Sequence, residues 1–216
     1  MSLLPIFVKL DGRLVVVVGG GKIAEGKIPA LLNAGARVRV IAPQISGAIA
    51  AWRQEQKLQW HAKAFEPGDL VGAILAIAAT SAAGVNEAVY READHLGILC
   101  NAVDDIEHCH FYFGAIVQRG DLQIAISTNG KSPALAQRLR KDLEARFGAE
   151  YGRWLDWLGA ERERLRARGD DPESTRIQLH KLASQSAFEH FLASARARRV
   201  PGVQSTAVRV AGQGTD

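Results

Sequence analysis

The chain has 216 residues, of which 47% are hydrophobic and 23% charged, a composition that is ordinary for a globular protein with a buried core. No apolar run is long enough to cross a membrane and the first residues carry no secretion signal, so the sequence predicts neither a membrane protein nor a secreted one. The net charge of +4 comes from scattered basic residues, which argues against nucleic-acid binding, and two cysteines without a disulfide framework fit the reducing cytoplasm.

The first half of the chain alternates between strand patterns and helix patterns. Strands are predicted at residues 14–18, 37–41, 58–61, 74–78 and 98–102, and helices at 22–34, 46–56 and 83–95. The first and fourth strands are apolar throughout, as expected for strands that are covered on both faces. This alternation predicts a parallel sheet with right-handed crossovers, and hence a Rossmann-like domain over residues 1–112.

A glycine-rich turn with the pattern Gly-x-Gly-x-x-Ala joins the first strand to the first helix. Gly19 permits the tight turn, Gly21 lets the backbone approach a pyrophosphate, and Ala24 lets the helix pack closely on the strand. Lys22 and Ile23 begin the helix, where free N–H groups face the phosphates. The turn predicts a dinucleotide site, the alternative being a tight turn that binds nothing.

Pro43 and Gln44 follow the second strand, at the place where dinucleotide-binding domains usually carry an acid for the adenosine ribose. The Gln44 amide can still hydrogen-bond a ribose, but it lacks the charge that repels a 2′-phosphate. The residues themselves therefore leave the choice between NAD and NADP open.

Beyond residue 111 the alternation stops. Strands are predicted at 111–117 and 122–127, followed by a helix that has Ser132 as its N-cap and Pro133 at its first position and that extends to about residue 147. These elements are too few to enclose a core alone, so residues 113–149 are interpreted as a small α+β dimerisation region.

The remainder reads as a helical module over residues 150–200 with a break at 169–172 and a second helix at 173–195. An aromatic stripe that includes Trp154 and Trp157 is interpreted as core rather than as a cofactor site. Residues 201–216 lack periodicity and are predicted to form a loose tail.

Six motifs resemble, in their order and spacing, the siroheme-synthase N-terminal family. The motifs are Leu4-Pro5-Ile6-Phe7, Val17-Val18-Gly19-Gly20-Gly21-Lys22-Ile23-Ala24, Val40-Ile41-Ala42-Pro43, Ala78-Ala79-Thr80, Cys100-Asn101-Ala102-Val103-Asp104-Asp105 and Ile126-Ser127-Thr128-Asn129-Gly130-Lys131-Ser132-Pro133-Ala134-Leu135-Ala136. The resemblance implies a homodimer that uses NAD to oxidise precorrin-2 to sirohydrochlorin, and in bifunctional members the insertion of Fe²⁺ to give siroheme.

Asp104 is the main candidate for catalysis. It follows the strand at 98–102, at the carboxyl edge of the sheet where open α/β sheets bind ligands, and by resemblance it is the acidic catalytic residue of the family. A carboxylate there can accept a proton as the ring system loses a hydride, although Asp104 and Asp105 also fit a simple polar loop. Thr80 and Asn101 end neighbouring strands; Asn101 is expected to bond the nicotinamide, to position Asp104, or to be a satisfied turn residue.

The polar loop before the helix at 132–147 is the candidate for binding substrate carboxylates. Ser127, Thr128, Asn129 and Lys131 lie just before a helix N-terminus, a position that suits an anion. In the family resemblance the anion is a carboxylate of the tetrapyrrole, and Thr128 stands where some relatives carry a phosphoserine.

Two alternatives accompany this interpretation. His108 and His110 share one side of an extended segment and can both meet a soft metal, but a polar entry into the next strand is the preferred explanation, and no metal ligand is assigned. The chain as a whole can instead be a Rossmann module that senses NAD(H) and regulates a partner protein.

Overall fold

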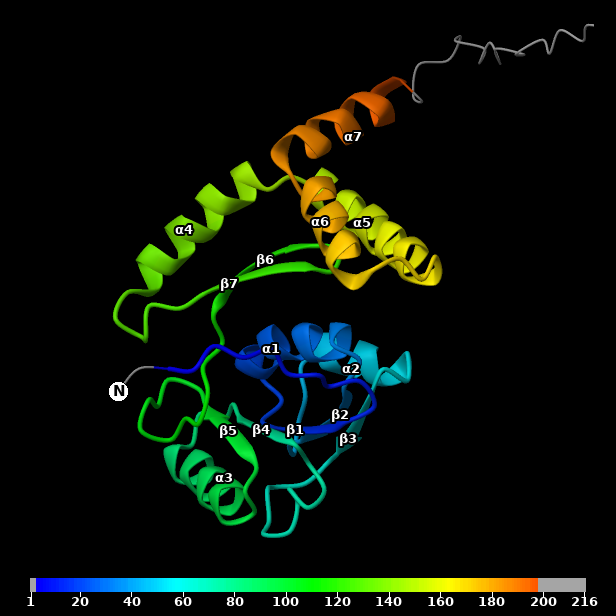
Figure 1. The fold of residues 1–216 in the computed structure, drawn as a ribbon. Coiled ribbons are helices and arrows are strands. Elements are labelled where there is room, and N and C mark those ends of the chain that lie inside the picture. Colours follow the sequence, from blue (N-terminus) through cyan, green and yellow to red (C-terminus); the bar gives the residue numbers. More distant parts are fainter. Residues whose placement is uncertain (1–2, 198–216) are drawn as a thin grey trace, which may run out of the picture. The chain divides into compact units, whose positions relative to one another are not determined.

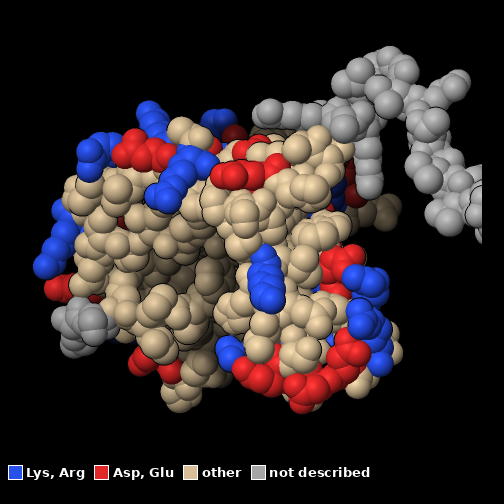
Figure 2. Space-filling model, turned by 45° about the horizontal axis from the view of Figure 1, so that its top comes forward, with Lys and Arg blue, Asp and Glu red and all other residues tan. Residues whose placement is uncertain are grey.

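The computed structural model describes residues 3–197, and the chain separates into two compact units, Met1–Phe113 and Gly114–Asp216. The tail predicted at 201–216 lies outside the described residues. None of the described helices is both long enough and apolar enough to cross a membrane. On the face drawn in Figure 2, lysine and arginine side chains lie among aspartates and glutamates.

The first unit is a five-stranded parallel sheet in the order β3-β2-β1-β4-β5. Its elements are β1 (Leu14–Val18), α1 (Lys22–Asn33), β2 (Arg37–Ile41), α2 (Gly47–Gln54), β3 (Leu58–His61), β4 (Leu75–Ala78), α3 (Ala83–His95) and β5 (Leu99–Ala102). Helices α1 and α2 cover one face of the sheet and α3 the other (Figure 1). The predicted α/β, Rossmann-like architecture is confirmed.

Strand β1 shows why its sequence is apolar throughout. Val15 and Val17 pack with the α1 and α2 side chains, whereas Val16 and Val18 pack with those of α3. Because alternate side chains of a strand point to opposite faces, a strand between two helical layers needs apolar residues at every position.

The second unit begins with the antiparallel pair β6 (Ala115–Arg119) and β7 (Leu122–Ile126). Four helices follow: α4 (Pro133–Arg146), α5 (Glu150–Ala167), α6 (Pro172–Leu182) and α7 (Gln185–Ala197). The aromatic stripe of α5 packs against α7, with the Tyr151 and Trp154 ring centroids 4.4 and 4.8 Å from that of Phe188. The stripe therefore packs within the second unit, in the direction predicted, although Trp154 and Trp157 are only half-buried.

Two predicted elements need correction. The strand predicted from residue 111 begins only at Ala115, because Phe111 and Phe113 pack on the core of the first unit instead. The single helix predicted at 173–195 is two helices, since the Ser184 hydroxyl accepts a hydrogen bond from the Ala187 N–H (3.3 Å) and starts a new helix there.

Candidate dinucleotide and catalytic site

The three glycines of the turn after β1 have different roles. Gly19 has φ +117°, and a Cβ on it would lie 2.3 Å from the Ala79 carbonyl oxygen. A Cβ on Gly20 would lie 2.1 Å from the Gln44 carbonyl oxygen, whereas one on Gly21 would meet nothing within 4 Å. The first two glycines are therefore required by the protein's own backbone, and the third leaves open space in front of α1.

The N-terminus of α1 has no side-chain cap, as is also true of α3 and α5. Ser46, Ser132 and Asp171 accept hydrogen bonds from N–H groups of α2, α4 and α6, but Gly21 at the N-cap of α1 offers no side chain to the helix. The first-turn N–H groups are left for an external acceptor. The open space at Gly21 and the uncapped helix together fit a dinucleotide pyrophosphate.

Lys22 and Glu25 lie in the first turn of α1 and pair with each other at 2.9 Å. The hydrogen bond from Lys22, with a second one from Ser46, holds the pKa of the Glu25 carboxyl below its ordinary value. The Glu25 charge next to the open helix end is thus offset by Lys22.

Backbone hydrogen bonds join the carboxyl ends of the strands into one edge. The Gly19 N–H donates to the Ile41 carbonyl (2.9 Å), the Ala79 N–H to Val18 (2.8 Å) and the Val103 N–H to Ala78 (3.0 Å). The register places the ends of β1, β4 and β5 level with one another. Five predicted residues therefore lie along this edge: Gly19, Gly21, Thr80, Asn101 and Asp104.

Pro43 and Gln44 lie at the same edge, just after β2, and both are exposed. The Gln44 carbonyl oxygen is the atom that a Cβ on Gly20 would clash with, so the loop after β2 lies directly against the glycine turn. The exposed Gln44 amide therefore remains a candidate contact for the adenosine ribose.

The Thr80 side chain is occupied by a neighbour that the sequence did not reveal. Its hydroxyl donates to Asn86 Oδ1 (2.7 Å), and Asn86 Nδ2 donates back to the Thr80 carbonyl (3.0 Å). Asn86 is buried on α3, where its spacing along the helix is that of an ordinary core position. This pair fixes the end of β4 beside the glycine turn.

Asn101 is buried, and its amide nitrogen is engaged within the loop that follows β5. Nδ2 donates to the Phe111 carbonyl (2.9 Å) and to Cys109 Sγ (3.3 Å). Of the roles considered for Asn101, these contacts favour the positioning of the loop over a contact with the nicotinamide.

Asp104 lies in the turn after β5, exposed and with φ +63°, a left-handed conformation that aspartate tolerates better than most residues. Within the described part of the chain its carboxylate has no hydrogen-bond or ion-pair partner. The adjacent Asp105 differs, because its carboxylate lies 2.6 Å from His108 Nδ1, a contact that holds the pKa of Asp105 below its ordinary value. Asp104 is thus the acid of this turn that is free to act on a ligand.

His108 and His110 each pair with a carboxylate. His108 bonds Asp105, and His110 Nε2 lies 3.2 Å from Asp94. Their rings lie on Tyr90, with centroid distances of 4.8 and 4.9 Å. Residues 3–197 contain no group of three or more His, Cys, Asp or Glu side chains arranged to hold a metal ion.

The polar loop before α4 belongs to the second unit and is held by its own hydroxyls. Thr128 Oγ1 accepts from the Ser132 N–H (3.2 Å), Ser127 Oγ accepts from the Asn129 N–H (3.1 Å), and Ser132 caps the helix. The Lys131 side chain is exposed. Because Ser132 already caps α4, this helix end is less open to an anion than that of α1, and Lys131 is the charged group left for a carboxylate.

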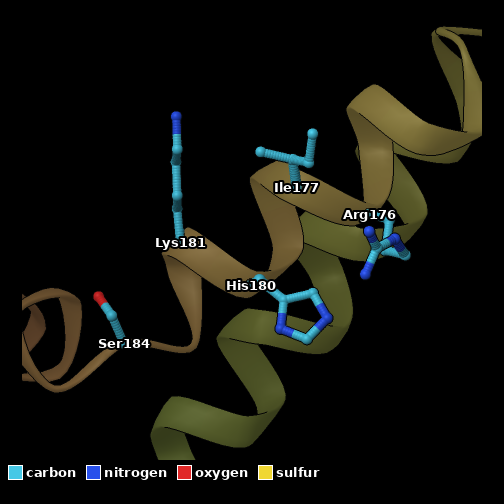
Figure 3. A pocket seen from close by; sticks show the side chains of 5 residues that line it. All are labelled: Arg176, Ile177, His180, Lys181 and Ser184. Atoms are coloured by element: carbon cyan, nitrogen blue, oxygen red, sulfur yellow. The ribbon is translucent and has the colours of Figure 1, made fainter.

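A shallow pocket of about 460 Å³ lies on α6, lined by Arg176, Ile177, His180, Lys181 and Ser184. Figure 3 shows Lys181 and Ile177 on one side of the helix and Arg176 and His180 on the other. Arg176 is also bound by both carboxylate oxygens of Glu173 (2.9 and 2.6 Å). These side chains do not converge on one ligand, and none of them is a predicted site residue.

Comparison with known proteins gives two family matches. Residues 6–115 match the family described as "Putative NAD(P)-binding", and residues 119–146 match the family described as "Sirohaem biosynthesis protein central". The first match covers about half of the chain and contains the whole parallel sheet.

Relatives are found among both sequences and solved structures. The siroheme synthase of Photorhabdus laumondii is 43% identical over 168 residues, which are 78% of this chain and 36% of that protein. The siroheme synthase of Methylobacillus flagellatus is 42% identical over 177 residues, 82% of this chain and 38% of that protein. The chain thus spans little more than a third of the length of these relatives. The structure of SirC, a precorrin-2 dehydrogenase, matches with a TM-score of 0.73 and 27% identity over 90% of this chain and 100% of that one.

Proposed function

The chain belongs to the siroheme synthase N-terminal family, and from that premise we propose that it oxidises precorrin-2 to sirohydrochlorin with NAD⁺. The observation that carries the proposal is the meeting of two features at one sheet edge. One is the uncapped helix behind Gly21, and the other is the unpartnered carboxylate of Asp104. The match over the full length of SirC supports the same activity.

The glycine turn binds the pyrophosphate in this proposal. The backbone of Gly21 approaches the phosphates closely, and the first N–H groups of α1, including those of Lys22 and Ile23, donate hydrogen bonds to the phosphate oxygens. Gln44 bonds the adenosine ribose, and the backbone at Thr80 lines the path of the cofactor along the sheet edge. The bound nicotinamide supplies a hydride acceptor.

In this proposal Asp104 accepts the proton that the oxidation releases. Oxidation of precorrin-2 removes a hydride and a proton, so a base is needed next to the macrocycle. The Asp104 carboxylate is exposed at the sheet edge and has no ion-pair partner among residues 3–197, so it can accept that proton. Ser127, Thr128, Asn129 and Lys131 bind substrate carboxylates in the proposal, with Lys131 providing the charge.

Turnover with precorrin-2 tests the proposal. We expect the purified protein, given precorrin-2 and NAD⁺ without oxygen, to form sirohydrochlorin and NADH in equal amounts, with no product when the dinucleotide is omitted. A correctly folded protein that binds NAD⁺ but forms no sirohydrochlorin would contradict the proposal and favour the NAD(H)-sensing module.

Insertion of Fe²⁺ is a second proposed activity, supported by relatives that are named siroheme synthases. The same Asp104 carboxylate can accept pyrrole protons as the metal enters. Adding Fe²⁺ to the sirohydrochlorin formed in the assay separates a bifunctional enzyme, which forms siroheme, from a dehydrogenase. The homodimer remains a prediction, and the mass of the protein in solution tests it.

Gln44 makes the choice between NAD and NADP testable. We expect Gln44→Asp to raise the preference for NAD⁺ over NADP⁺ about 10-fold, because a carboxylate bonds the ribose hydroxyls and repels a 2′-phosphate. The ratio of kcat/KM for the two cofactors measures this. Gln54→Asp, which adds the same charge at an exposed position of α2, is the control and should leave the ratio unchanged. A wild-type protein that prefers NADP⁺ would overturn the choice of NAD, and a variant with an unchanged ratio would overturn the assignment of Gln44.

A further inference from the structure

The turn that carries Asp104 is closed on its inner side by a partly buried polar contact. It leaves β5 after Ala102 and returns at Cys109, which forms an isolated antiparallel bridge with Asn101. Seven residues thus run between two backbone positions that are held side by side. Asp104 is near the start of this loop, in its left-handed conformation.

The Cys109 side chain makes three contacts inside the loop. Its Sγ lies 3.1 Å from the Ala102 carbonyl oxygen and 3.1 Å from the Asp105 carbonyl oxygen, and its single S–H proton is shared between these two acceptors. It also accepts a hydrogen bond from Asn101 Nδ2 (3.3 Å). The two carbonyls bracket Asp104 in the chain, so the thiol connects both sides of the catalytic turn.

The thiol keeps the proton that this contact needs. Burial raises the pKa of Cys109 above its ordinary value, so the S–H group is retained at neutral pH. The other free cysteine, Cys100, is fully buried beside β4 but has no side-chain hydrogen bond within the described residues. Cys109 therefore holds the loop through side-chain hydrogen bonds, whereas the Cys100 side chain does not.

The outer side of the same loop is held less firmly. Asp105 and His108 form an ion pair whose side chains are 38% and 28% exposed, and pairs of this kind contribute little to stability in water. The inner contact is partly buried, and it joins the thiol to two backbone carbonyls and to the Asn101 amide, so it links both ends of the turn.

We propose that Cys109 is a positioning residue for catalysis, holding the turn so that the Asp104 carboxylate points to the substrate. This inference rests on the proposed role of Asp104 in precorrin-2 oxidation. Cys109 does not touch the substrate in the proposal; it acts through the carbonyls of Ala102 and Asp105.

Two substitutions remove the thiol contact in different ways. Cys109→Ala removes the thiol group, and Cys109→Val replaces it with a somewhat larger apolar side chain that has no donor. We expect both to lower kcat about 10- to 100-fold, because a small displacement of a catalytic group is costly, while the Kd for NAD⁺ stays unchanged. Cys109→Ser restores a donor and should recover most of the lost kcat. Cys100→Ala removes the neighbouring buried thiol, which makes no side-chain hydrogen bond within the described residues; it is the matched control and should keep the wild-type kcat.

Hydrogen exchange reports the position of the turn without any substrate. Amide protons in segment 102–110 should exchange at least about 10-fold faster in Cys109→Ala and Cys109→Val, and at the wild-type rate in Cys109→Ser and Cys100→Ala. If Cys109→Ala does not fold, Cys109→Val decides the question.

The outcomes separate this inference from the proposed function. Loss of activity in Asp104→Asn together with a wild-type kcat in Cys109→Val would overturn the role of Cys109 and leave that of Asp104 intact. Loss of kcat in Cys109→Val without faster exchange, or without recovery in Cys109→Ser, would also overturn it. Full activity of Asp104→Asn would instead contradict the proposed role of Asp104.

Discussion

Asp104→Asn is expected to lower kcat for precorrin-2 oxidation by about 100- to 10,000-fold, the range typical of a lost general base. Asparagine keeps the size of the side chain and tolerates the left-handed conformation at φ +63°, so the turn should stay intact. The Kd for NAD⁺ and the unfolding temperature should remain those of the wild-type protein. Single-turnover formation of sirohydrochlorin, followed together with NAD⁺ binding, measures the effect.

Glu107→Gln is the matched control for this substitution. Glu107 is an exposed carboxylate on the same loop, and its removal changes the charge by the same amount. We expect the control to keep kcat within about 2-fold of the wild-type value, as for a surface change away from the chemistry. Equal losses of kcat in both variants would mean that the charge of the loop matters rather than a base at Asp104. An Asp104→Asn protein with the wild-type kcat would remove Asp104 from the mechanism.

Alanine substitutions at Gly20 and Gly21 should separate stability from cofactor binding. Gly20→Ala places a Cβ 2.1 Å from the Gln44 carbonyl oxygen, so the loop after β2 must move, at an expected cost of about 3 kcal/mol of unfolding free energy. Gly21→Ala meets no protein atom within 4 Å, and Gly21 has an ordinary φ of −89°. It should leave stability unchanged and weaken NAD⁺ binding about 10- to 100-fold, since the new methyl group occupies the space for the pyrophosphate.

Denaturant unfolding and NAD⁺ titration of the two variants test this contrast, and each variant is the control for the other. Two results would contradict the account. One is a Gly21→Ala protein that binds NAD⁺ as tightly as the wild type, because the open space would then not be the phosphate site. The other is a Gly20→Ala protein of wild-type stability, because the close approach of the loop after β2 would then be absent in solution.

The sheet and the dinucleotide turn could be predicted from the sequence because local rules determine them. A strand covered on both faces needs apolar residues at every position, and β1 and β4 satisfy that rule without reference to distant residues. The turn after β1 needs Gly19 for its positive φ, which is again a local requirement. Asp104 could be placed because the carboxyl ends of parallel strands meet at one edge.

Other features depend on contacts that the sequence pattern does not encode. Phe111 and Phe113 alternate with polar neighbours as in a strand, yet they cover the core beside α1, where Lys27 lies 4.5 Å from the Phe113 ring centroid. The need for Gly20 comes from the loop after β2, and the link between Asn101 and Cys109 spans eight positions of the chain. The start of α7 did have a local signal, because Ser184 is an N-cap residue. The helical periodicity continues across it, so the sequence was interpreted as one helix.

A structure of the protein with NAD⁺ and precorrin-2 bound would show directly whether cofactor and substrate meet at this sheet edge. We expect the pyrophosphate to lie against the backbone of Gly21 and the first N–H groups of α1, with the Asp104 carboxylate within about 3.2 Å of the macrocycle or of one bridging water. A dinucleotide bound away from Gly21, or a macrocycle out of reach of Asp104, would contradict this expectation.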